Sequence, residues 1–215
     1  MEDIVIRNLC KSFAGKPVLR DFSAVLPVGQ VTGLMAPSGA GKTTLLRILM
    51  GLERPDGGTI DGLAGLRLSA VFQEDRLIPS LSARANVGLV LDREHQELAE
   101  LYLADLGLAG WVNALPQALS GGMQRRVAIA RAFAYGEQCG QDTVYLLDEP
   151  LKGLDEETAI HTLRLIRRWV AGRLAFFITH DREQARQIAD WIITFAGQPM
   201  RVSGMEQNRP FHPLK

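Results

Sequence analysis

The chain has 215 residues, of which 47% are hydrophobic and 22% are charged, enough to bury a sizeable core in one domain or a domain with a subdomain. Lys plus Arg and Asp plus Glu are equal at 24 each, so the neutral balance gives no electrostatic reason to expect a nucleic-acid partner. The sequence has no apolar run near the roughly 18–20 residues that span a bilayer, no signal peptide, and only two isolated cysteines, which we expect to be ordinary thiols in a reducing cytoplasm.

The first third of the sequence predicts strands around a glycine-rich loop. Residues 2–13 (EDIVIRNLCKSF) alternate apolar and polar side chains, as a half-buried strand does. Residues 24–37 contain a second strand region with a Pro-Val-Gly turn, and it runs directly into the loop. Residues 42–52 (KTTLLRILMGL) have apolar residues at helical spacing, and residues 68–73 (LSAVFQ) indicate another short buried strand. The first strands are expected to form an antiparallel flank.

The middle of the chain differs in character. Leu, Ala and Glu dominate and strand signals vanish, which predicts an inserted helical subdomain over residues 81–118. The core of the domain would then comprise residues 1–80 and 119–215.

Strand signals resume in the last third, at residues 143–148 (TVYLLD) and 174–179 (LAFFIT). An amphipathic helix over residues 155–172 separates them. Because strands and helices alternate, we expect an α/β fold whose core sheet is mainly parallel.

The stretch APSGAGKTT, between a predicted strand and a predicted helix, is typical of a phosphate-binding loop. Its glycines let the backbone curl so that successive N–H groups point inward at a helix N-terminus. Lys42 could reach the β- and γ-phosphates, and the Thr43 hydroxyl could bind Mg²⁺. A chance glycine-rich turn is the alternative, which the flanking strand and helix disfavour. The residues expected to contact nucleotide here are Pro37, Ser38, Gly39, Ala40, Gly41, Lys42, Thr43 and Thr44.

Ala36 departs from the pattern G-x-x-x-x-G-K-[ST], which begins with glycine. If this position needed a positive φ, alanine would cost about 1–2 kcal/mol. The phosphate-facing amides are expected later, from Gly39 to Thr44, so such a cost would fall on folding more than on binding.

Two carboxylates end the predicted strand in TVYLLDEP. Asp148, at the carboxyl edge, could hold Mg²⁺ through water, and Glu149 could face an attacking water as a general base. The alternative is a solvated acidic pair at a strand end, which the upstream loop makes less favourable.

A second candidate cradle lies in LSGGMQRRVAIARA, residues 119–132. Ser120 is a good N-cap, and the two glycines after it leave neighbouring amides bare. The alternative is simply a capped helix after a loop. A chain with one complete phosphate cradle seldom needs a second for the same ligand.

LSGGMQ resembles the signature sequence of ATP-binding cassette (ABC) ATPases, and the motifs follow one another along the chain in the order typical of that family. The similarity extends from Ile4 to roughly Ile193. The resemblance implies a P-loop NTPase core, with ATP and Mg²⁺ as cofactors. In that family two copies pair head to tail, so that the signature of one closes on the ATP of the other. The residues expected to serve the partner's nucleotide are Ser120, Gly121, Gly122 and Gln124.

The resemblance assigns roles to further positions. Phe13 matches the aromatic residue that stacks on adenine, although a core Phe would look the same in sequence. Asp155 matches the aspartate of the loop that crosses the dimer interface, and Lys152 stands in that loop where many relatives have a small residue. The catalytic residues are expected to be Lys42, Gln73, Glu149 and His180, and the metal-binding residues Thr43, Gln73 and Asp148.

The resemblance also implies an ATPase subunit that lies on the cytoplasmic face of a membrane and drives separate permease subunits. Residues 74–87 (EDRLIPSLSARANV) resemble the stretch on which the permease docks in the importers of nitrate, taurine and alkanesulfonates. In such importers a solute-binding protein delivers the solute to the permease. The alternative is an ABC ATPase of lipoprotein release, cell division or DNA maintenance. The transported solute is not encoded in this chain.

Overall fold

The structure is a computed structural model, which describes residues 2–37, 40–197 and 199–208. Its strands, in chain order, are β1 (Ile4–Phe13), β2 (Lys16–Leu26), β3 (Val31–Met35), β4 (Gly57–Asp61), β5 (Arg67–Val71), β6 (Thr143–Asp148), β7 (Ala175–Thr179), β8 (Trp191–Ala196) and β9 (Arg201–Gln207).

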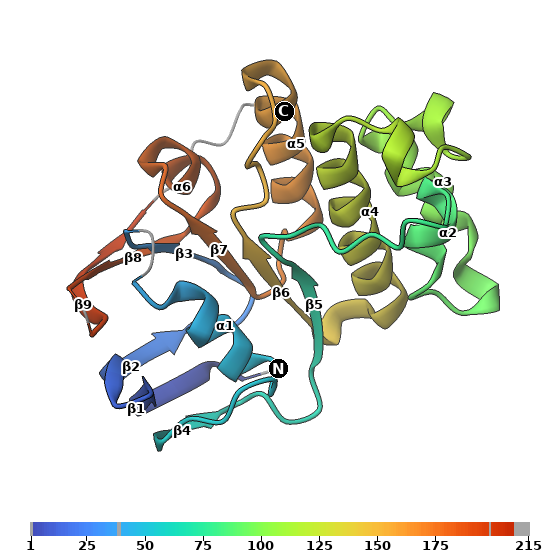
Figure 1. The fold of residues 1–215 in the computed structure, drawn as a ribbon. Helices are drawn as coiled ribbons and strands as arrows, with labels where there is room; N and C mark the ends of the chain where they lie inside the picture. The colour runs from blue at the N-terminus through green and yellow to red at the C-terminus, as the bar shows by residue number, and fades with distance from the viewer. Residues whose placement is uncertain (1, 38–39, 198, 209–215) are drawn as a thin grey trace.

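Helices follow or separate most of these strands (Figure 1). The α-helices are α1 (Lys42–Leu49), α2 (Ala83–Gly88), α3 (Glu97–Asp105), α4 (Gly121–Cys139), α5 (Glu156–Trp169) and α6 (Arg182–Ile188). The short 3₁₀ helices are η1 (Arg93–His95), η2 (Ala109–Trp111), η3 (Pro116–Ala118) and η4 (Gly140–Asp142). Within the described ranges, no helix is both long and apolar enough to traverse a bilayer.

The strands form two sheets. The larger has the order β5-β6-β7-β3-β8-β9, in which β9 alone runs antiparallel to its neighbour, and the smaller has the antiparallel order β2-β1-β4. The predicted mainly parallel core and antiparallel flank are therefore confirmed. β9 was not predicted, because all seven of its residues are exposed and it lacks the alternation that marks a half-buried strand.

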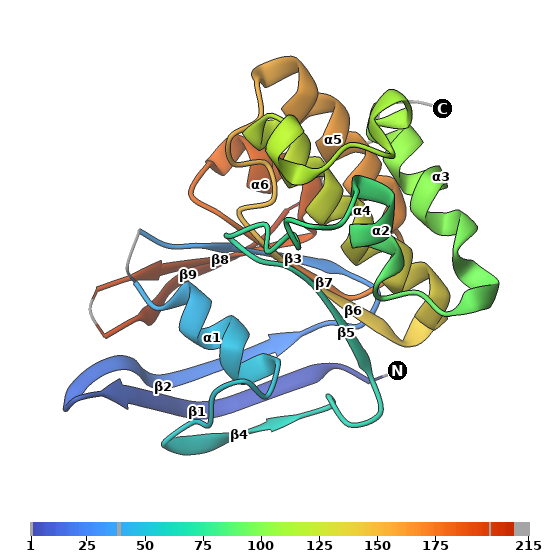
Figure 2. The ribbon, with the colours of Figure 1, turned by 45° about the vertical axis from the view of Figure 1, so that its right-hand side comes forward.

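Helix α1 lies between the two sheets, and this places the start of the helix beside the large sheet (Figure 2). Leu45 and Leu49 of α1 join a buried cluster with Ile6 of β1 and Ile178 of β7. Helices α4, α5 and α6 cover the opposite face of the large sheet, in a second cluster. Since both faces are covered, every residue of β6 and β7 is buried.

A group of helices lies to one side of the sheets, between β5 and α4 in the sequence (Figure 1). Helices α2 and α3 pack on α4 and on each other. The buried side chain of Asn86 in α2 accepts a hydrogen bond from the Ile78 N–H at 2.7 Å and donates to the Ile78 and Leu81 carbonyls. The segment entering these helices is therefore held against α2.

Candidate functional site

The start of α1 has a backbone geometry that requires glycine. Gly41 is its N-cap, with φ of 109°, in the left-handed region. A Cβ at this position would also lie 2.7 Å from Cγ1 of Val18, closer than carbon atoms pack. No side chain caps the helix, so its first N–H groups remain available to an anion.

Lys42 is buried and lies across the loop before α1. Its Nζ donates to the Ala36 carbonyl at 2.6 Å and to the Pro37 carbonyl at 3.2 Å. The Ala40 N–H also donates to the Pro37 carbonyl, at 3.2 Å. The predicted contacts Ser38 and Gly39 lie outside the described residues.

Ala36 is 6% exposed and packs in the cluster between the two sheets. It is not among the described residues with positive φ. The strain considered for an alanine at the start of the loop therefore does not arise.

A pocket of about 280 Å³ brings together seven of the predicted site residues, from three separate stretches of the sequence. Its lining residues are Val18, Gly41, Lys42, Thr43, Thr44, Gln73, Asp148 and Glu149. Apart from Val18 of β2, they come from the start of α1, the end of β6 and the segment after β5, so the pocket lies at the carboxyl edge of the parallel sheet.

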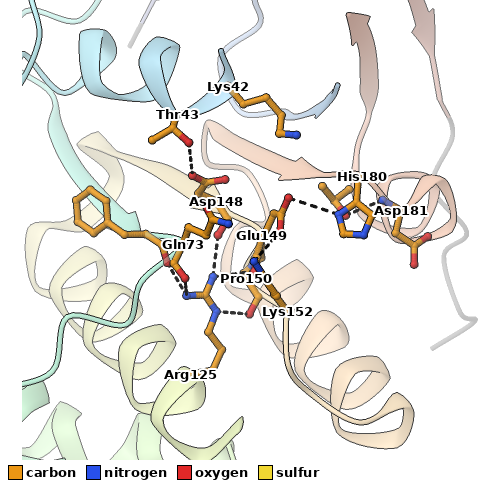
Figure 3. A network of polar contacts seen from close by, with 12 residues as sticks. Lys42, Thr43, Gln73, Arg125, Asp148, Glu149, Pro150, Lys152, His180 and Asp181 are labelled. Carbon is orange, nitrogen blue, oxygen red and sulfur yellow. Dashed lines mark hydrogen bonds and ion pairs between the residues drawn. The ribbon is translucent and has the colours of Figure 1, made fainter. Parts of the chain in front are cut away.

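The end of β6 faces the start of α1 (Figure 3). The Thr43 hydroxyl donates to Oδ2 of Asp148 at 3.3 Å, although 105 residues separate the two in sequence. Asp148 is 3% exposed. Burial raises the pKa of this carboxyl above its usual range, and the neighbouring charge of Glu149 raises it further.

This oxygen-rich corner fits a hard divalent cation. The described residues contain no group of three or more His, Cys, Asp and Glu that could hold a metal. Thr43, Gln73 and Asp148 instead offer a hydroxyl, an amide and a carboxylate, to which Mg²⁺ adds waters and substrate phosphates. A cation here would also compensate the raised pKa of Asp148, because a nearby positive charge favours the ionised carboxyl.

Glu149 follows directly after β6 and has an unusual backbone, with φ of 46°. Such a conformation costs a non-glycine residue about 1–3 kcal/mol and persists only where the surroundings enforce it. The Glu149 N–H donates to the Ile178 carbonyl at 2.9 Å. Its Oε1 lies 3.4 Å from Nδ1 of His180, and its Oε2 lies 3.9 Å from Nζ of Lys152. Its carboxylate therefore lies between two basic side chains.

His180 is held by the turn after β7. Asp181 caps α6 by accepting hydrogen bonds from the Glu183 and Gln184 N–H groups at 2.8 and 3.2 Å. The Asp181 N–H donates to the Thr179 hydroxyl at 3.0 Å. The exposed imidazole of His180 thus extends from a well-bonded turn and can reach both Glu149 and solvent.

The second candidate cradle lies at the exposed start of α4. Ser120 caps the helix, because its hydroxyl accepts a hydrogen bond from the Met123 N–H at 3.2 Å. A Cβ on Gly121 would meet no atom within 4 Å, whereas one on Gly122 would lie 3.3 Å from the Gly153 carbonyl oxygen. The Gln124 amide donates to the Pro116 carbonyl of η3 at 3.0 Å and to the Leu119 carbonyl just after η3 at 3.1 Å. Gln124 therefore fixes the approach to the helix, and Ser120 and Gly121 face outward.

Several predicted contacts do not line the pocket. Phe13 is 45% exposed at the end of β1, where Nζ of Lys11 lies 5.2 Å from the centre of its ring. Asp155 caps α5 by accepting from the Thr158 N–H at 3.0 Å, and that hydrogen bond lowers the pKa of its carboxyl. With Ser120, these residues lie outside the lining.

Arg125 was not identified as a candidate from the sequence. It is 3% exposed, and its guanidinium bonds to segments around Gln73 and Glu149. The signal was its position: Arg125, Ala128, Ile129 and Ala132 lie at helical spacing on one buried stripe of α4. An arginine on an apolar stripe indicates a buried partner.

The sequence profile of the ABC transporter family matches residues 19–152. The aliphatic sulfonates import ATP-binding protein SsuB 2 of Pseudomonas syringae pv. tomato is 38% identical over 197 residues, which cover 90% of this chain and 82% of that relative. The Fe(3+) ions import ATP-binding protein FbpC 1 of Rhizobium meliloti is 39% identical over 210 residues, which cover 88% of this chain and 57% of that relative.

The fold is similar to a solved dimeric structure of the ATP-binding cassette MJ0796, in a post-hydrolysis state bound to ADP and Pi. The TM-score is 0.83 at 28% sequence identity, and the match covers 97% of this chain and 100% of that one.

Proposed function

This chain belongs to the ABC transporter family, and we propose from this premise that it is the ATP-hydrolysing subunit of an importer for a small solute. The observation that carries the proposal is the pocket in which Lys42, Thr43, Asp148 and Glu149 meet at one edge of the sheet.

We propose that the phosphates of ATP bind at the start of α1. The bare N–H groups of that helix would cradle the phosphate oxygens. The Lys42 ammonium would exchange the Ala36 carbonyl for the β- and γ-phosphates, since it already lies over the loop. Mg²⁺ would be held by Thr43, Asp148 and Gln73, and it would neutralise charge on the β- and γ-phosphate oxygens.

Glu149 is the proposed base for hydrolysis. Its carboxylate would accept a proton from water as the water oxygen bonds to the γ-phosphorus and the bond to the ADP oxygen breaks. His180 would hold the carboxylate and the γ-phosphate in register, because its ring already lies beside Oε1 of Glu149.

We infer that the ATP site is completed by a second copy of the chain. The start of α4 presents Ser120 and Gly121 outward, and neither lines the pocket of its own chain. Asp155 would lie in the loop that crosses the dimer interface, and Phe13 would stack on the adenine ring. The dimeric cassette bound to ADP and Pi supports this arrangement. ATP would then drive head-to-tail closure, and hydrolysis would reopen the dimer.

The proposed permease docks where the nucleotide-binding core, which we assign to residues 1–80 and 119–215, meets the helical subdomain, which we assign to residues 81–118. A groove of about 410 Å³ is lined by β5 and the segment after it, by the residues that follow α2 and by α4, and the exposed Ile78 and Leu89 are among its lining residues. Its lining is mostly apolar, with Arg76 and Arg131 among the lining residues, and suits a short cytoplasmic helix of a membrane protein. We therefore propose a peripheral position on the cytoplasmic face of a membrane, with no nucleic-acid partner.

The relatives favour an importer of the sulfonate type, whose solute is delivered by a separate solute-binding protein. Relatives named for aliphatic sulfonates and for Fe(3+) ions are 38% and 39% identical to this chain. Such similar identities for unlike solutes indicate that the ATPase does not select the solute.

Purification from native membranes tests this proposal. We expect a multi-spanning permease to co-purify with the chain and MgATP hydrolysis to accompany the complex. Mass spectrometry of the ligand carried by the associated solute-binding protein would then identify the solute. Recovery of DNA or ribosomes without any membrane protein would reject the transport role and favour the alternative ABC functions.

A further inference from the structure

Arg125 connects the outward-facing start of α4 with the backbone beside the pocket. It is five positions after Ser120 and is among the few charged residues of the described chain that are buried. A buried guanidinium is stable only if its N–H groups find acceptors, so its partners show what the residue holds in place.

One side of the guanidinium holds the backbone at the end of β6. Nη2 donates to the Asp148 and Glu149 carbonyls, each at 2.7 Å, and Nε donates to the Pro150 carbonyl at 2.9 Å (Figure 3). These are three consecutive residues around the proposed base. Because Glu149 adopts a positive φ, contacts of this kind can fix a backbone that is unfavourable in isolation.

The other side holds the segment after β5. Nη1 donates to the Phe72 carbonyl, approaches the Gln73 carbonyl at 3.5 Å and pairs with Oδ1 of Asp75 at 3.0 Å. Gln73 is one of the proposed Mg²⁺ ligands. A single side chain thus bonds to the segments of both Gln73 and Glu149, while its own helix carries Ser120.

We infer that Arg125 is a positioning residue for ATP hydrolysis, which sets Glu149 and Gln73 relative to the signature helix. The inference rests on the proposed function, in which Glu149 is the general base and Ser120 contacts the nucleotide of the partner copy. The hydrogen-bond partners of Arg125 among the described residues lie in residues 72–75 and 148–150, and none of them belongs to the described part of the loop before α1. Arg125 therefore acts on the hydrolysis step and leaves ATP binding to Lys42.

The geometry of the guanidinium explains why arginine serves here. Its planar fork presents five N–H donors in fixed directions, and it bonds carbonyls on both sides at once. A lysine ammonium is a single point with three donors, and it can satisfy only part of this set. Arg125→Lys is therefore expected to keep the fold while loosening Glu149 and Gln73.

Arg173 provides a matched control for a purely structural role. It is also a buried arginine, and it donates to the Gly136 carbonyl, the Tyr145 hydroxyl at 2.6 Å and Glu137 at 3.0 Å. None of these partners lines the proposed ATP pocket. Loss of its fork should lower stability without changing hydrolysis.

The experiment compares the purified 215-residue chain with its variants Arg125→Lys, Arg173→Lys and Asp75→Asn. For each we would measure the melting temperature, the Kd for MgATP, and kcat and KM for phosphate release at a temperature where all are folded. Asp75→Asn weakens the same link from its acidic end, so the inference stays testable if Arg125→Lys fails to fold.

We expect Arg125→Lys to lower kcat about 10- to 100-fold, the scale of a misplaced catalytic group, with the Kd for MgATP within about twofold of wild type. Asp75→Asn should lower kcat less, also at unchanged Kd, and Arg173→Lys should lower only the melting temperature. The inference is overturned if the Arg125 and Asp75 variants keep wild-type kcat, or if Arg173→Lys lowers kcat to the same extent. A wild-type chain without any MgATP hydrolysis would reject the proposed function itself, which is a different result.

Discussion

Nδ1 of His180 lies 3.4 Å from Oε1 of Glu149, and each residue is the first one after its strand. The strands concerned, β6 and β7, are parallel neighbours with Asp148 opposite Ile178. The backbone also connects them, because the Glu149 N–H donates to the Ile178 carbonyl. The register of these two buried strands therefore sets the contact between the two side chains.

Glu149→Gln should separate ATP binding from hydrolysis. The amide keeps the size of the side chain but cannot accept the proton, so phosphate release should fall about 10²- to 10⁴-fold. The loop around Lys42 is unchanged, so the Kd for MgATP should stay near the wild-type value. We expect the variant to elute as a dimer on size exclusion with MgATP and as a monomer without it. A chain that stays monomeric with MgATP would contradict the proposed closure.

Ser120→Arg in the Glu149→Gln background tests whether the start of α4 serves the partner's ATP. Ser120 is exposed and lies outside its own pocket, so a bulky cation there should block the dimer face. We expect the MgATP-dependent dimer to disappear while the monomer binds MgATP with unchanged Kd. Ser120→Ala is the milder control, because it removes the N-cap at a cost of about 0.5–2 kcal/mol and adds no bulk. An unchanged dimer in the arginine variant would place the interface elsewhere.

The sequence predicted best those features that depend on local pattern. The apolar runs of β6 and β7, and the loop that leads into α1, follow from composition and spacing alone. The resemblance to ABC ATPases is confirmed by the family match. The strand β9 was missed because it is exposed throughout. The apolar stripe of α4 could have indicated that Arg125 is buried, but not what it bonds to, because its acceptors are mostly backbone carbonyls, which carry no sequence signature. The sequence also does not show where the Gln124 side chain points. It was expected to serve the partner's nucleotide, and in the structure its amide donates to the Pro116 carbonyl.

Lys42→Ala should impair the ATP site severely, whereas Ala36→Gly should leave it almost unaffected. Lys42→Ala removes the charge beside the phosphates and should nearly abolish hydrolysis. Ala36 is buried without positive φ, so glycine should leave the Kd for ATP almost unchanged. The added freedom of the unfolded chain should cost Ala36→Gly about 0.4–1 kcal/mol of stability. The rate of phosphate release checks the first expectation, and calorimetric Kd values and melting temperatures check the second. A large gain in affinity from Ala36→Gly would show that the alanine weakens the site.

Asp148→Asn should stabilise the metal-free chain at neutral pH. Burial, followed by the charge of Glu149, raises the pKa of Asp148 above the 3.8 of the free group. The folded chain then binds more protons than the unfolded chain between these two pKa values, so its stability falls as pH rises through that window and stays lower above it. Asparagine carries no charge, so the variant should melt at a higher temperature than wild type at neutral pH, and the difference should shrink as pH falls toward 3.8.

Magnesium supplies the control for this reasoning. A cation that binds the folded wild type raises its melting temperature by mass action, and the effect requires the ionised Asp148 carboxyl. We therefore expect MgCl₂ with ADP to stabilise the wild type more than Asp148→Asn, as measured by differential scanning calorimetry across the pH range. Equal stabilisation of both chains would show that the cation binds without Asp148. If the metal-free variant melted below the metal-free wild type at neutral pH, the buried carboxylate would be stabilised by its surroundings. The expected pattern, a more stable variant that has lost its metal response, is the signature of a charge that is retained for chemistry at a cost to folding.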